Sequence, residues 1–569
     1  MRLPSLRSHR LWPRLLVACA AALAMTGCAG LPQDVQRPES HAVEPEGTAL
    51  HALVAQRRAQ AGARAASGFA LLDGPQAAYG SRLALVEAAQ KTLDLQYYAI
   101  HADASNSRLL RSVGEAAARG VRVRILLDDF HTTGRNAQVL QLAYVPNVQM
   151  RLFNPLPGSR DSTVRRVIQS LGDVQRIQQR MHNKLFIADN ALGITGGRNL
   201  GDAYFGLGES GNFVDLDVLA AGPIVREMSR SFDSYWNNER AYPVQSLVTP
   251  KELAEMRERQ RRAPQEAEGA EGAPRPPDGE PRPGPGQPDP AQEAIRRARA
   301  WDHQPMDLRT QPFVWAPSAL QVDAPAKIPA DAQAAASPAP DAPAPARGQL
   351  PEGETVVDGL LRLIAEAQQD LLIISPYFVP GADMKKAFAD AVQRGVRVRV
   401  LTNSLASNDA PIAHVGYARH RRELLDAGVQ LYEMRSEQAG LGSALGSSAG
   451  SASATGQSRA MLHSKVLVRD GRLLVIGSMN LDLRSQLQNT EIALLIRSRE
   501  LSAQATELIE RSLREGSWRV EREKEGSGGL VWRAPAGSAL ADARTEPDSS
   551  LGLRLLLRVI GPLAPDEML

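Results

Sequence analysis

One pattern of polar residues occurs twice in this chain of 569 residues, and the two copies lie 281 positions apart. In each copy, a histidine is followed at fixed intervals by lysine, aspartate, glycine and asparagine. The copies comprise His182, Lys184, Asp189, Gly196 and Asn199, and then His463, Lys465, Asp470, Gly477 and Asn480. Each residue type has an average usage on the order of 1/20, so chance repetition in one register is very rare. The chain must therefore fold into a structure that uses the same polar pattern twice.

The sequence around the motifs is duplicated as well. The six residues 119–124, Arg-Gly-Val-Arg-Val-Arg, recur letter for letter at 394–399. Apolar periodicity predicts alternating helices and strands in both halves, an order typical of layered α/β folds. These segments are 80–91, 92–100, 107–119 and 121–128 in the first half, and 357–369, 371–377, 384–394 and 396–402 in the second. A unit of about 170 to 180 residues is too long for a solenoid repeat, so we predict two homologous domains.

Composition predicts six parts along the chain. They are a lipoprotein signal peptide at 1–27, a tether at 28–69, a first domain at 70–250, an insertion at 251–350, a second domain at 351–520 and a C-terminal extension at 521–569. The insertion is rich in Pro and Ala, a composition that cannot bury enough apolar surface to order itself, so most of it is expected to be disordered. Its aromatic stretch around Trp301 and 313–317 is expected to dock on the domains.

The N-terminus has the layout of an export signal. Four arginines precede an apolar run at 15–25, which is too short to span a membrane comfortably. Thr26-Gly27-Cys28 resembles the lipobox of bacterial lipoproteins, so Cys28 is expected to carry lipid. Because Cys19 is the other cysteine and lies within the signal, the mature chain can form no internal disulfide. The alternative is an ordinary signal peptide with an incidental cysteine. Ala29 favours a lipoprotein that faces the periplasm from the outer membrane.

The charge balance argues against a nucleic-acid partner. The chain has 66 basic and 63 acidic residues, and four of the basic residues lie in the signal peptide. The mature chain therefore has one more acid than bases. Proteins that bind nucleic acids usually carry a clear basic excess, which is missing here.

The doubled motif fits the chemistry of phosphodiester transfer. A histidine and a lysine two positions apart on a strand point to the same face. One neutral imidazole can attack phosphorus and form a covalent phosphohistidine, while a second imidazole gives a proton to the leaving alcohol. The lysines and asparagines of both copies, Lys184, Lys465, Asn199 and Asn480, could stabilise the phosphoryl oxygens without a metal or cofactor. One histidine from each half is expected to contribute to a single site.

Carboxylates near the motifs divide into two groups. Each histidine needs a carboxylate to fix its tautomer, and Asp215 after the first motif and Glu491 after the second are the candidates. Asp189 and Asp470 belong to the catalytic pattern but are expected to hold the turn and the strand pairing. Asp128-Asp129 offers no fuller set of metal ligands, so it is interpreted as a polar wall near the site.

The chain resembles the phospholipase D superfamily, whose signature is a doubled His-x-Lys-x4-Asp motif, and within it the C-type branch of bacterial cardiolipin synthases. The similar segments are 96–98, 127–129, 196–205, 375–381, 480–485 and 562–569. The resemblance implies two facing α/β/α sandwich domains related by a pseudo-two-fold axis, with His182 as nucleophile and His463 as general acid and base. Gly197 stands where the pattern often has serine, whereas the second copy has Ser478.

The expected function is a phosphatidyltransferase that makes cardiolipin. Phosphatidylglycerol or phosphatidylethanolamine would donate a phosphatidyl group to His182, and a second phosphatidylglycerol would accept it. Hydrolysis to phosphatidic acid is the main alternative. A nuclease and a non-catalytic envelope protein are less favoured. The partners are therefore phospholipids and a membrane, and any accessory protein is left open.

Two further features are ambiguous in the sequence. The aromatic pairs Tyr97-Tyr98 and Tyr377-Phe378 could line the pocket or belong to the core. The segment 551–563 has the pattern of an amphipathic helix, for which packing on the second domain is favoured over contact with a bilayer.

Overall fold

The computed structural model describes residues 31–170, 173–208, 211–255, 258, 304–328, 355–436, 459–523 and 529–566. The signal peptide, Cys28 and most of the Pro/Ala-rich insertion lie outside the described residues. Among those described, no helix combines the length and the apolar character that crossing a bilayer requires.

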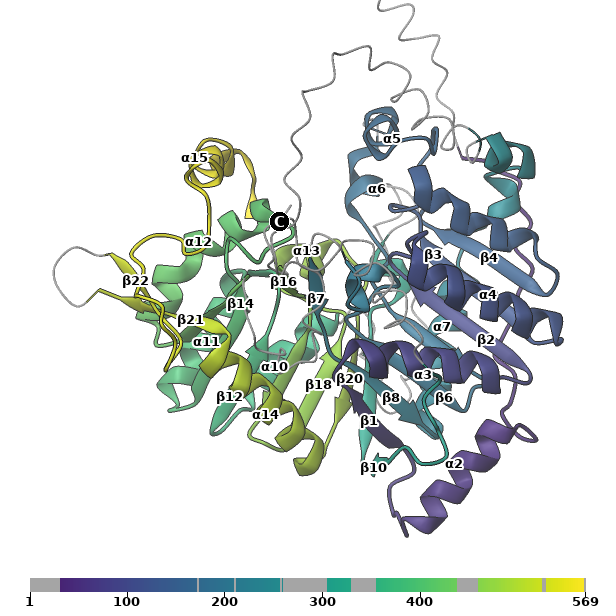
Figure 1. Cartoon of the computed structure of the whole chain (residues 1–569), viewed down its shortest axis with the longest axis horizontal. Coiled ribbons are helices and arrows are strands. Elements are labelled where there is room, and N and C mark those ends of the chain that lie inside the picture. Colours follow the sequence, from purple (N-terminus) through teal and green to yellow (C-terminus); the bar gives the residue numbers. More distant parts are fainter. Residues whose placement is uncertain are drawn as a thin grey trace, which may run out of the picture.

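The first domain is built on a nine-stranded sheet (Figure 1). In spatial order its strands are β10 (Val314–Trp315), β1 (Gly68–Leu72), β8 (Asp217–Ala221), β6 (Leu192–Gly196), β5 (Leu185–Ala188), β2 (Thr92–Tyr97), β3 (Arg122–Asp128), β4 (Val148–Phe153) and β9 (Ala241–Pro243). Strands β2, β3 and β4 are parallel, so their carboxyl ends meet at one edge. The longer helices are α3 (Pro75–Ala88), α4 (Ala104–Ala118) and α7 (Pro223–Trp236).

The second domain has a nine-stranded sheet whose first eight strands follow the same order as the run from β1 to β9, so β10 and the last strand of the second sheet are extra edge strands. Its strands are β11 (Ser318–Val322), β20 (Ile492–Ile496), β18 (Leu473–Gly477), β17 (Val466–Arg469), β12 (Asp370–Ile374), β14 (Arg397–Asn403), β15 (Gln430–Met434), β21 (Ser517–Arg522) and β22 (Leu530–Arg533). The corresponding parallel strands are β12, β14 and β15. Its longer helices are α10 (Val356–Ala365), α11 (Ala382–Gln393), α12 (Pro411–Asp426) and α14 (Arg499–Glu515). The predicted pair of homologous α/β domains is confirmed.

Three apolar clusters hold the helices against the sheets. One joins α3 and α4 to the first sheet, and another joins α10, α11 and α12 to the second. The third contains α7, α14 and side chains from both sheets, such as Leu126 and Leu372. Because strand residues alternate between two faces, each sheet contributes to the shared cluster and to one of its own. The shared cluster fixes the two domains face to face.

The segment predicted as a tether, residues 28–69, is partly folded. Helix α2 (Ala49–Gln60) begins at the cap residue Thr48, and Leu50 and Val54 are buried. Upstream of it, the backbone N–H of Ala42 donates to Asp233 over 2.7 Å. The tether prediction is therefore wrong for residues 31–60, since long-range hydrogen bonds order a stretch that has little apolar periodicity of its own.

Two predicted boundaries also change. The aromatic part of the insertion, residues 304–328, docks as an edge strand on each sheet, β10 beside β1 and β11 beside β20. The predicted boundary at residue 520 cuts strand β21, and β22 pairs with β21 beyond it. The second sheet therefore extends to Arg533, and the C-terminal extension is shorter than the sequence indicated.

Candidate active site

The two histidines lie where short bridges join the domains. Strand β16 (Ala460–Leu462) pairs in parallel with β7 (Asn212–Val214) of the first domain, and His463 follows directly. In the other half, Met181 forms a parallel bridge with Thr490, and the His182 N–H donates to the Thr490 carbonyl over 3.0 Å. The lysines come immediately before β5 and β17. Both motifs are thus brought together at the interface between the domains.

Each histidine is paired with a carboxylate from the opposite domain. Nδ1 of His182 lies 3.0 Å from Oε2 of Glu491, and Nδ1 of His463 lies 2.8 Å from Oδ2 of Asp215. Both carboxylates are the ones predicted from the sequence, but their order along the chain does not predict that they are exchanged between the motifs. Since Nδ1 is occupied, Nε2 is the ring nitrogen left to react with a substrate.

The lysines are buried beside the histidines. Nζ of Lys184 donates to the His182 carbonyl over 2.7 Å, and Nζ of Lys465 donates to the His463 carbonyl over 2.5 Å. Burial, together with the charge of Lys465, lowers the pKa of Lys184 to about 7. Burial likewise lowers the pKa of Lys465 to about 8. Two cations held so close together form a site that favours an anion between them.

The histidines differ in how strongly their surroundings oppose a positive charge. Burial and the charges of Lys184 and Lys465 hold the pKa of His182 well below its ordinary value. Burial and Lys465 also lower the pKa of His463, but the hydrogen bond to Asp215 works in the opposite direction. The surroundings therefore favour the neutral form of His182 more strongly than that of His463.

The two carboxylates differ in how strongly their surroundings oppose a negative charge. Burial raises the pKa of Glu491 to about 7. Burial opposes the charge of Asp215 as well, but its hydrogen bond with His463 and the charges of His463 and Lys465 hold the pKa of Asp215 below its usual value. The ionised Asp215 can stabilise a protonated His463 better than Glu491 can stabilise a protonated His182.

Gly197 of the first motif stands where the second motif has Ser478, and the reason is steric. The hydroxyl of Ser478 donates to Glu491 and accepts the N–H of Ile492 over 3.0 Å. At the matching position, a Cβ on Gly197 would lie 2.3 Å from Oδ1 of Asp215. Asp215 therefore occupies the space that a serine side chain would need, and the first copy lacks the hydroxyl contact.

The aspartates of the motif lie away from the reacting groups. Asp189 accepts the backbone N–H groups of Gln90, Lys91 and Thr92. Asp470 accepts those of 368–370 in the same way. Both residues have positive φ, of 50° and 54°, a conformation that Asp tolerates in turns. Their expected structural role is confirmed, whereas their place among the catalytic residues stays a prediction.

The two asparagines are not equivalent. Oδ1 of Asn199 accepts the Ala99 N–H over 3.2 Å, and its Nδ2 donates to the Tyr204 hydroxyl over 3.0 Å. Its amide group therefore holds the loop. In contrast, Oδ1 of Asn480 is buried without a hydrogen-bond partner. We therefore expect Asn480, rather than Asn199, to contact a substrate.

Aromatic rings surround the histidines. The Tyr98 ring lies edge-on to His182 at 5.2 Å between centroids, and Tyr204 and Phe213 lie 5.3 and 5.0 Å from His463. Tyr97 and Phe378 belong to the core, so one residue of each ambiguous aromatic pair packs inward. His131, whose ring lies 4.8 Å from Tyr98, could not be predicted as part of the site, because no motif contains it.

Asp323 is a second residue that was missed. It lies in the segment assigned to the insertion, yet its carboxylate accepts the Glu491 N–H over 2.9 Å and the Val356 N–H over 2.7 Å. Lys327 pairs with it at 2.7 Å. The linker between the domains therefore supports the carboxylate that orients His182.

Asp128 and Asp129 support the site from the carboxyl end of β3. Asp128 accepts the Met181 N–H over 2.9 Å, one residue before His182. Asp129 pairs with Arg160 and Arg166. The predicted polar wall is thus a set of buried ion pairs that fix the start of the His182 segment.

This chain is similar to several known proteins. A family model described as "Cardiolipin synthase, PLD-like domain" matches residues 83–236 and 360–513. Cardiolipin synthase C of Escherichia coli strain K12 is 32% identical over 514 residues, covering 86% of this chain and 94% of the relative. A protein of Helicobacter pylori strain J99 is 29% identical, with 84% of each chain covered. The crystal structure of a Haemophilus influenzae phosphatidylserine synthase aligns with a TM-score of 0.49 at 14% identity, covering 81% of this chain and 91% of that one.

Proposed function

Because the chain belongs to the phospholipase D-like family that includes the bacterial cardiolipin synthases, we propose that it is a cardiolipin synthase. It would transfer the phosphatidyl group of one phospholipid to a hydroxyl of phosphatidylglycerol. The observation that carries this proposal is the pair of histidines, each held by a carboxylate from the opposite domain, around two buried lysines. All of these groups come from one chain.

In the first step, Nε2 of His182 attacks the phosphorus of the donor lipid. A phosphorus–nitrogen bond forms, and the bond from phosphorus to the headgroup oxygen breaks. His463, protonated at Nε2, gives its proton to that oxygen, so the headgroup leaves as a neutral alcohol. Lys184, Lys465 and Asn480 would stabilise the negative charge on the other phosphoryl oxygens.

In the second step, the neutral His463 takes the proton from the hydroxyl of the acceptor. The acceptor oxygen attacks phosphorus, and the phosphorus–nitrogen bond breaks, which releases His182. With phosphatidylglycerol as acceptor, the product is cardiolipin. With water as acceptor, the product is phosphatidic acid, and the enzyme would be a phospholipase D.

The roles of the histidines follow from their surroundings. A nucleophile must be neutral, and the pKa of His182 is held well below its ordinary value by burial and the nearby lysines. A general acid must carry a proton, and the ionised Asp215 favours the charge on His463. The asymmetry supports His182 as nucleophile and His463 as acid and base.

The test is a lipid assay with the purified protein. We expect cardiolipin to accumulate from phosphatidylglycerol, with or without phosphatidylethanolamine as donor, when the lipids are separated by chromatography. His182→Ala and His463→Ala should abolish the product, whereas His51→Ala, a partly exposed histidine on α2, should not. Phosphatidic acid without cardiolipin would make hydrolysis the function. Full activity in both motif variants would contradict the family chemistry.

The proposed location is the periplasmic side of the bacterial envelope, with lipid attached at Cys28. The support is the sequence of the signal segment and its cysteine. Cys28→Ala should prevent incorporation of labelled palmitate and release the protein from the membrane fraction. Unchanged labelling would contradict the anchor.

A further inference from the structure

The six most exposed of the large hydrophobic side chains in the described structure lie on two helices. Helix α5 (Thr163–Gln169) exposes Val164 and Ile168, with 69% and 61% of their surface accessible. Helix α15 (Leu551–Ile560) exposes four more: Leu551, Leu555, Leu556 and Val559, at 63%, 52%, 55% and 73%. A soluble surface rarely gathers so many aliphatic side chains without a function for them.

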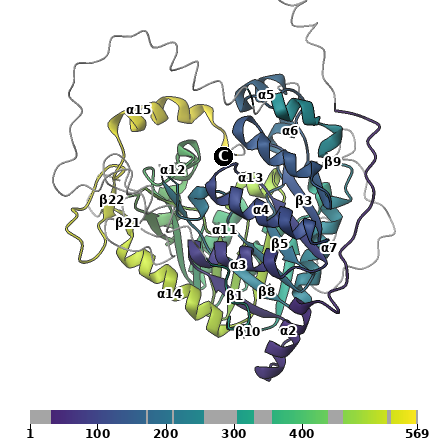
Figure 2. The same ribbon diagram turned by 45° about the vertical axis from the view of Figure 1, so that its right-hand side comes forward.

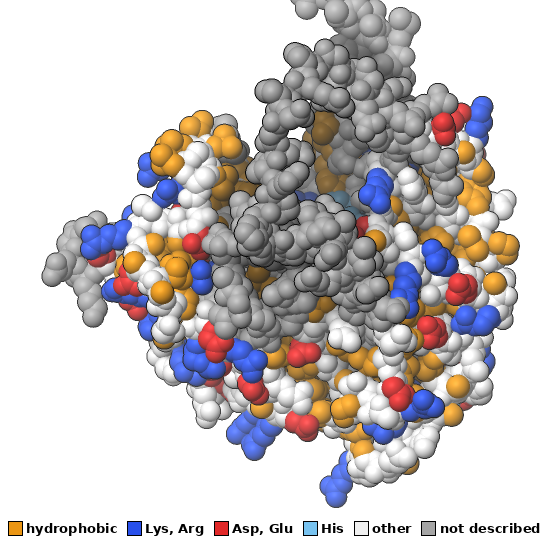
Figure 3. Space-filling view, in the orientation of Figure 1, with side chains coloured by type: hydrophobic (Ala, Val, Ile, Leu, Met, Phe, Trp, Pro, Cys, Tyr) orange, Lys and Arg blue, Asp and Glu red, His pale blue; other side chains and the backbone are white. Residues whose placement is uncertain are grey.

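The two helices lie on the same side of the molecule. Figure 1 places α5 at the top of the first domain and α15 at the top of the second, and Figure 2 shows the same arrangement after rotation. The space-filling view in Figure 3 shows a hydrophobic patch over α15 with basic side chains beside it. The two helices therefore expose aliphatic side chains at two separate places on one face of the molecule.

This face lies at the sheet edge that carries the active site. In the first domain, Asp129 follows the carboxyl end of β3 and pairs with Arg166 of α5. In the second domain, Asn403 ends β14, and its side chain accepts the Leu462 N–H over 2.9 Å, immediately before His463. Leu405, two residues later, lines the cavity beneath α15. Both helices are thus connected to the edge where the histidines lie.

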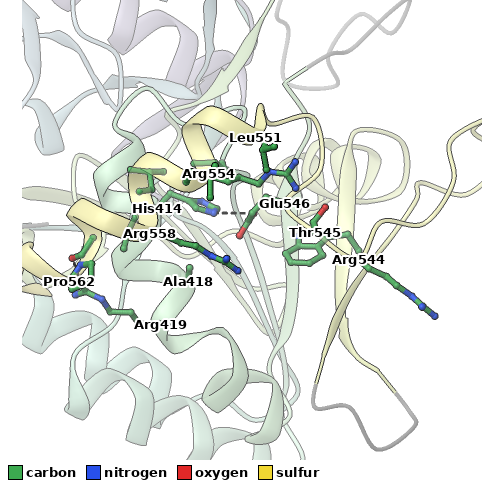
Figure 4. Close-up of a pocket in the computed structure, with 16 residues that line it drawn as sticks. His414, Ala418, Arg419, Arg544, Thr545, Glu546, Leu551, Arg554, Arg558 and Pro562 are labelled. Atoms are coloured by element: carbon green, nitrogen blue, oxygen red, sulfur yellow. Dashed lines mark hydrogen bonds and ion pairs between the residues drawn. The ribbon is translucent and has the colours of Figure 1, made fainter.

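Helix α15 is held by the segments at both of its ends. On the N-terminal side, Arg421 of α12 pairs with Glu546 at 2.6 Å. Arg419 of α12 donates to the carbonyl of Ala564 over 2.8 Å and to that of Gly561 over 2.5 Å. Leu557 is buried, whereas the four aliphatic residues listed above are exposed. Beneath the helix is an open cavity of about 830 Å³, and Figure 4 shows Arg554 and Arg558 at its wall. The helix therefore lies over the domain without burying most of its apolar residues.

The charges of both helices suit an anionic surface. Helix α15 contains Arg554 and Arg558, and α5 contains the exposed Arg165, while neither helix contains an acidic residue. Arginine can keep its charge among phosphate groups while its stem follows apolar surface. Leucine and arginine without acids on a short helix are typical of segments that bind at the bilayer interface.

We propose that α5 and α15 bind the surface of an anionic phospholipid bilayer and hold the active-site edge toward it. The inference rests on the proposed function, because a site for lipid headgroups has to reach them at the membrane. The sequence pattern of 551–563 favours packing on the second domain. The structure shows that the segments on either side of the helix and Leu557 hold it on the domain, while most of its aliphatic side chains stay exposed.

Amide hydrogen exchange tests this inference without depending on catalysis. The full chain with His182→Ala, which lacks the attacking nitrogen and should not react with lipid, is reconstituted into phosphatidylcholine vesicles with or without phosphatidylglycerol. We expect the amides of 163–169 and 551–560 to exchange at least about fivefold more slowly with phosphatidylglycerol, and those of α2 to be unchanged. Equal rates for α5 and α15 in both kinds of vesicle would overturn the proposal.

A second measurement separates docking from damage to the fold. The variant with serine at Leu551, Leu555, Leu556 and Val559 should lose about tenfold or more activity on vesicles, since burying even one leucine changes partitioning by about that factor. Its activity on short-chain phosphatidylglycerol dispersed as monomers should be unchanged. Val43→Ser, an exposed aliphatic residue elsewhere, is the control. Equal losses on both substrates would contradict docking. Inactive wild-type protein would contradict the proposed function and leave the exchange result standing.

Discussion

His182 and Glu491 are 309 residues apart in the chain, yet Nδ1 of the histidine lies 3.0 Å from the glutamate Oε2. The equivalent pair, His463 and Asp215, is exchanged in the opposite direction. Neither domain therefore holds a histidine together with its carboxylate. The shared apolar cluster that fixes the domains face to face therefore also holds both histidine–carboxylate pairs together.

The two carboxylates should respond differently to loss of charge. Asp215→Asn removes an ionised partner from the histidine that must become protonated, so kcat should fall by roughly 10²- to 10⁴-fold. Glu491→Gln should cost about tenfold, because the raised pKa of about 7 already leaves much of Glu491 neutral near pH 7. Steady-state kinetics on phosphatidylglycerol measures both. A larger loss for Glu491→Gln would reverse the assigned roles of the histidines.

The activity should decline on the alkaline side of neutrality. The pKa values of Lys184 and Lys465 are lowered to about 7 and about 8, so these lysines lose their charge as the pH rises through that range. Fewer positive charges then remain for the phosphate. The pH profile of kcat/KM reports groups of the free enzyme, and it should fall between pH of about 7 and 9. A profile that stays flat up to pH of about 10 would contradict this account.

Exchanging residues between the two motifs should show that they are not interchangeable. Gly197→Ser places a side chain 2.3 Å from Asp215 Oδ1 and should displace that carboxylate, with a loss of about a hundredfold in kcat. Ser478→Gly removes one hydroxyl from Glu491 and should cost about tenfold. Kinetics on the two single variants provides the comparison. An unchanged kcat in the Gly197→Ser variant would mean that Asp215 is not held where the structure places it.

Asp323 should influence both stability and catalysis. Asp323→Asn weakens the acceptor of the Glu491 and Val356 N–H groups and leaves Lys327 without its ion pair, so unfolding should become easier by about 1–3 kcal/mol. The kcat should fall as Glu491 loses its position. Asp307→Asn, an exposed change in the same linker, is the matched control. Denaturant unfolding and lipid assays measure the two effects, and a variant identical to the control would exclude the supporting role.

The sequence predicted the features that rest on local patterns. Repeated motifs and helix–strand alternation predicted two α/β domains, and the residue types around His182 and His463 predicted Asp215 and Glu491 as partners. Long-range contacts could not be predicted in this way. The exchange of the carboxylates depends on how the domains face each other, and Asp323 lies in a segment whose composition resembles a linker. The fit of Gly197 against Asp215 is visible only in three dimensions.

The central claim is that His182 carries the phosphatidyl group. The full chain with His463→Ala, incubated with phosphatidylglycerol labelled at phosphorus, tests this claim most directly, since loss of the base in the second step should slow release from the protein. We predict label bound to protein through an acid-labile phosphohistidine that mass spectrometry of peptides locates at His182. Because His463 also donates the proton of the first step, the label should appear slowly, and samples denatured at high pH after increasing times preserve the acid-labile bond. Label at another residue, or no label while lipid product still forms, would contradict the account.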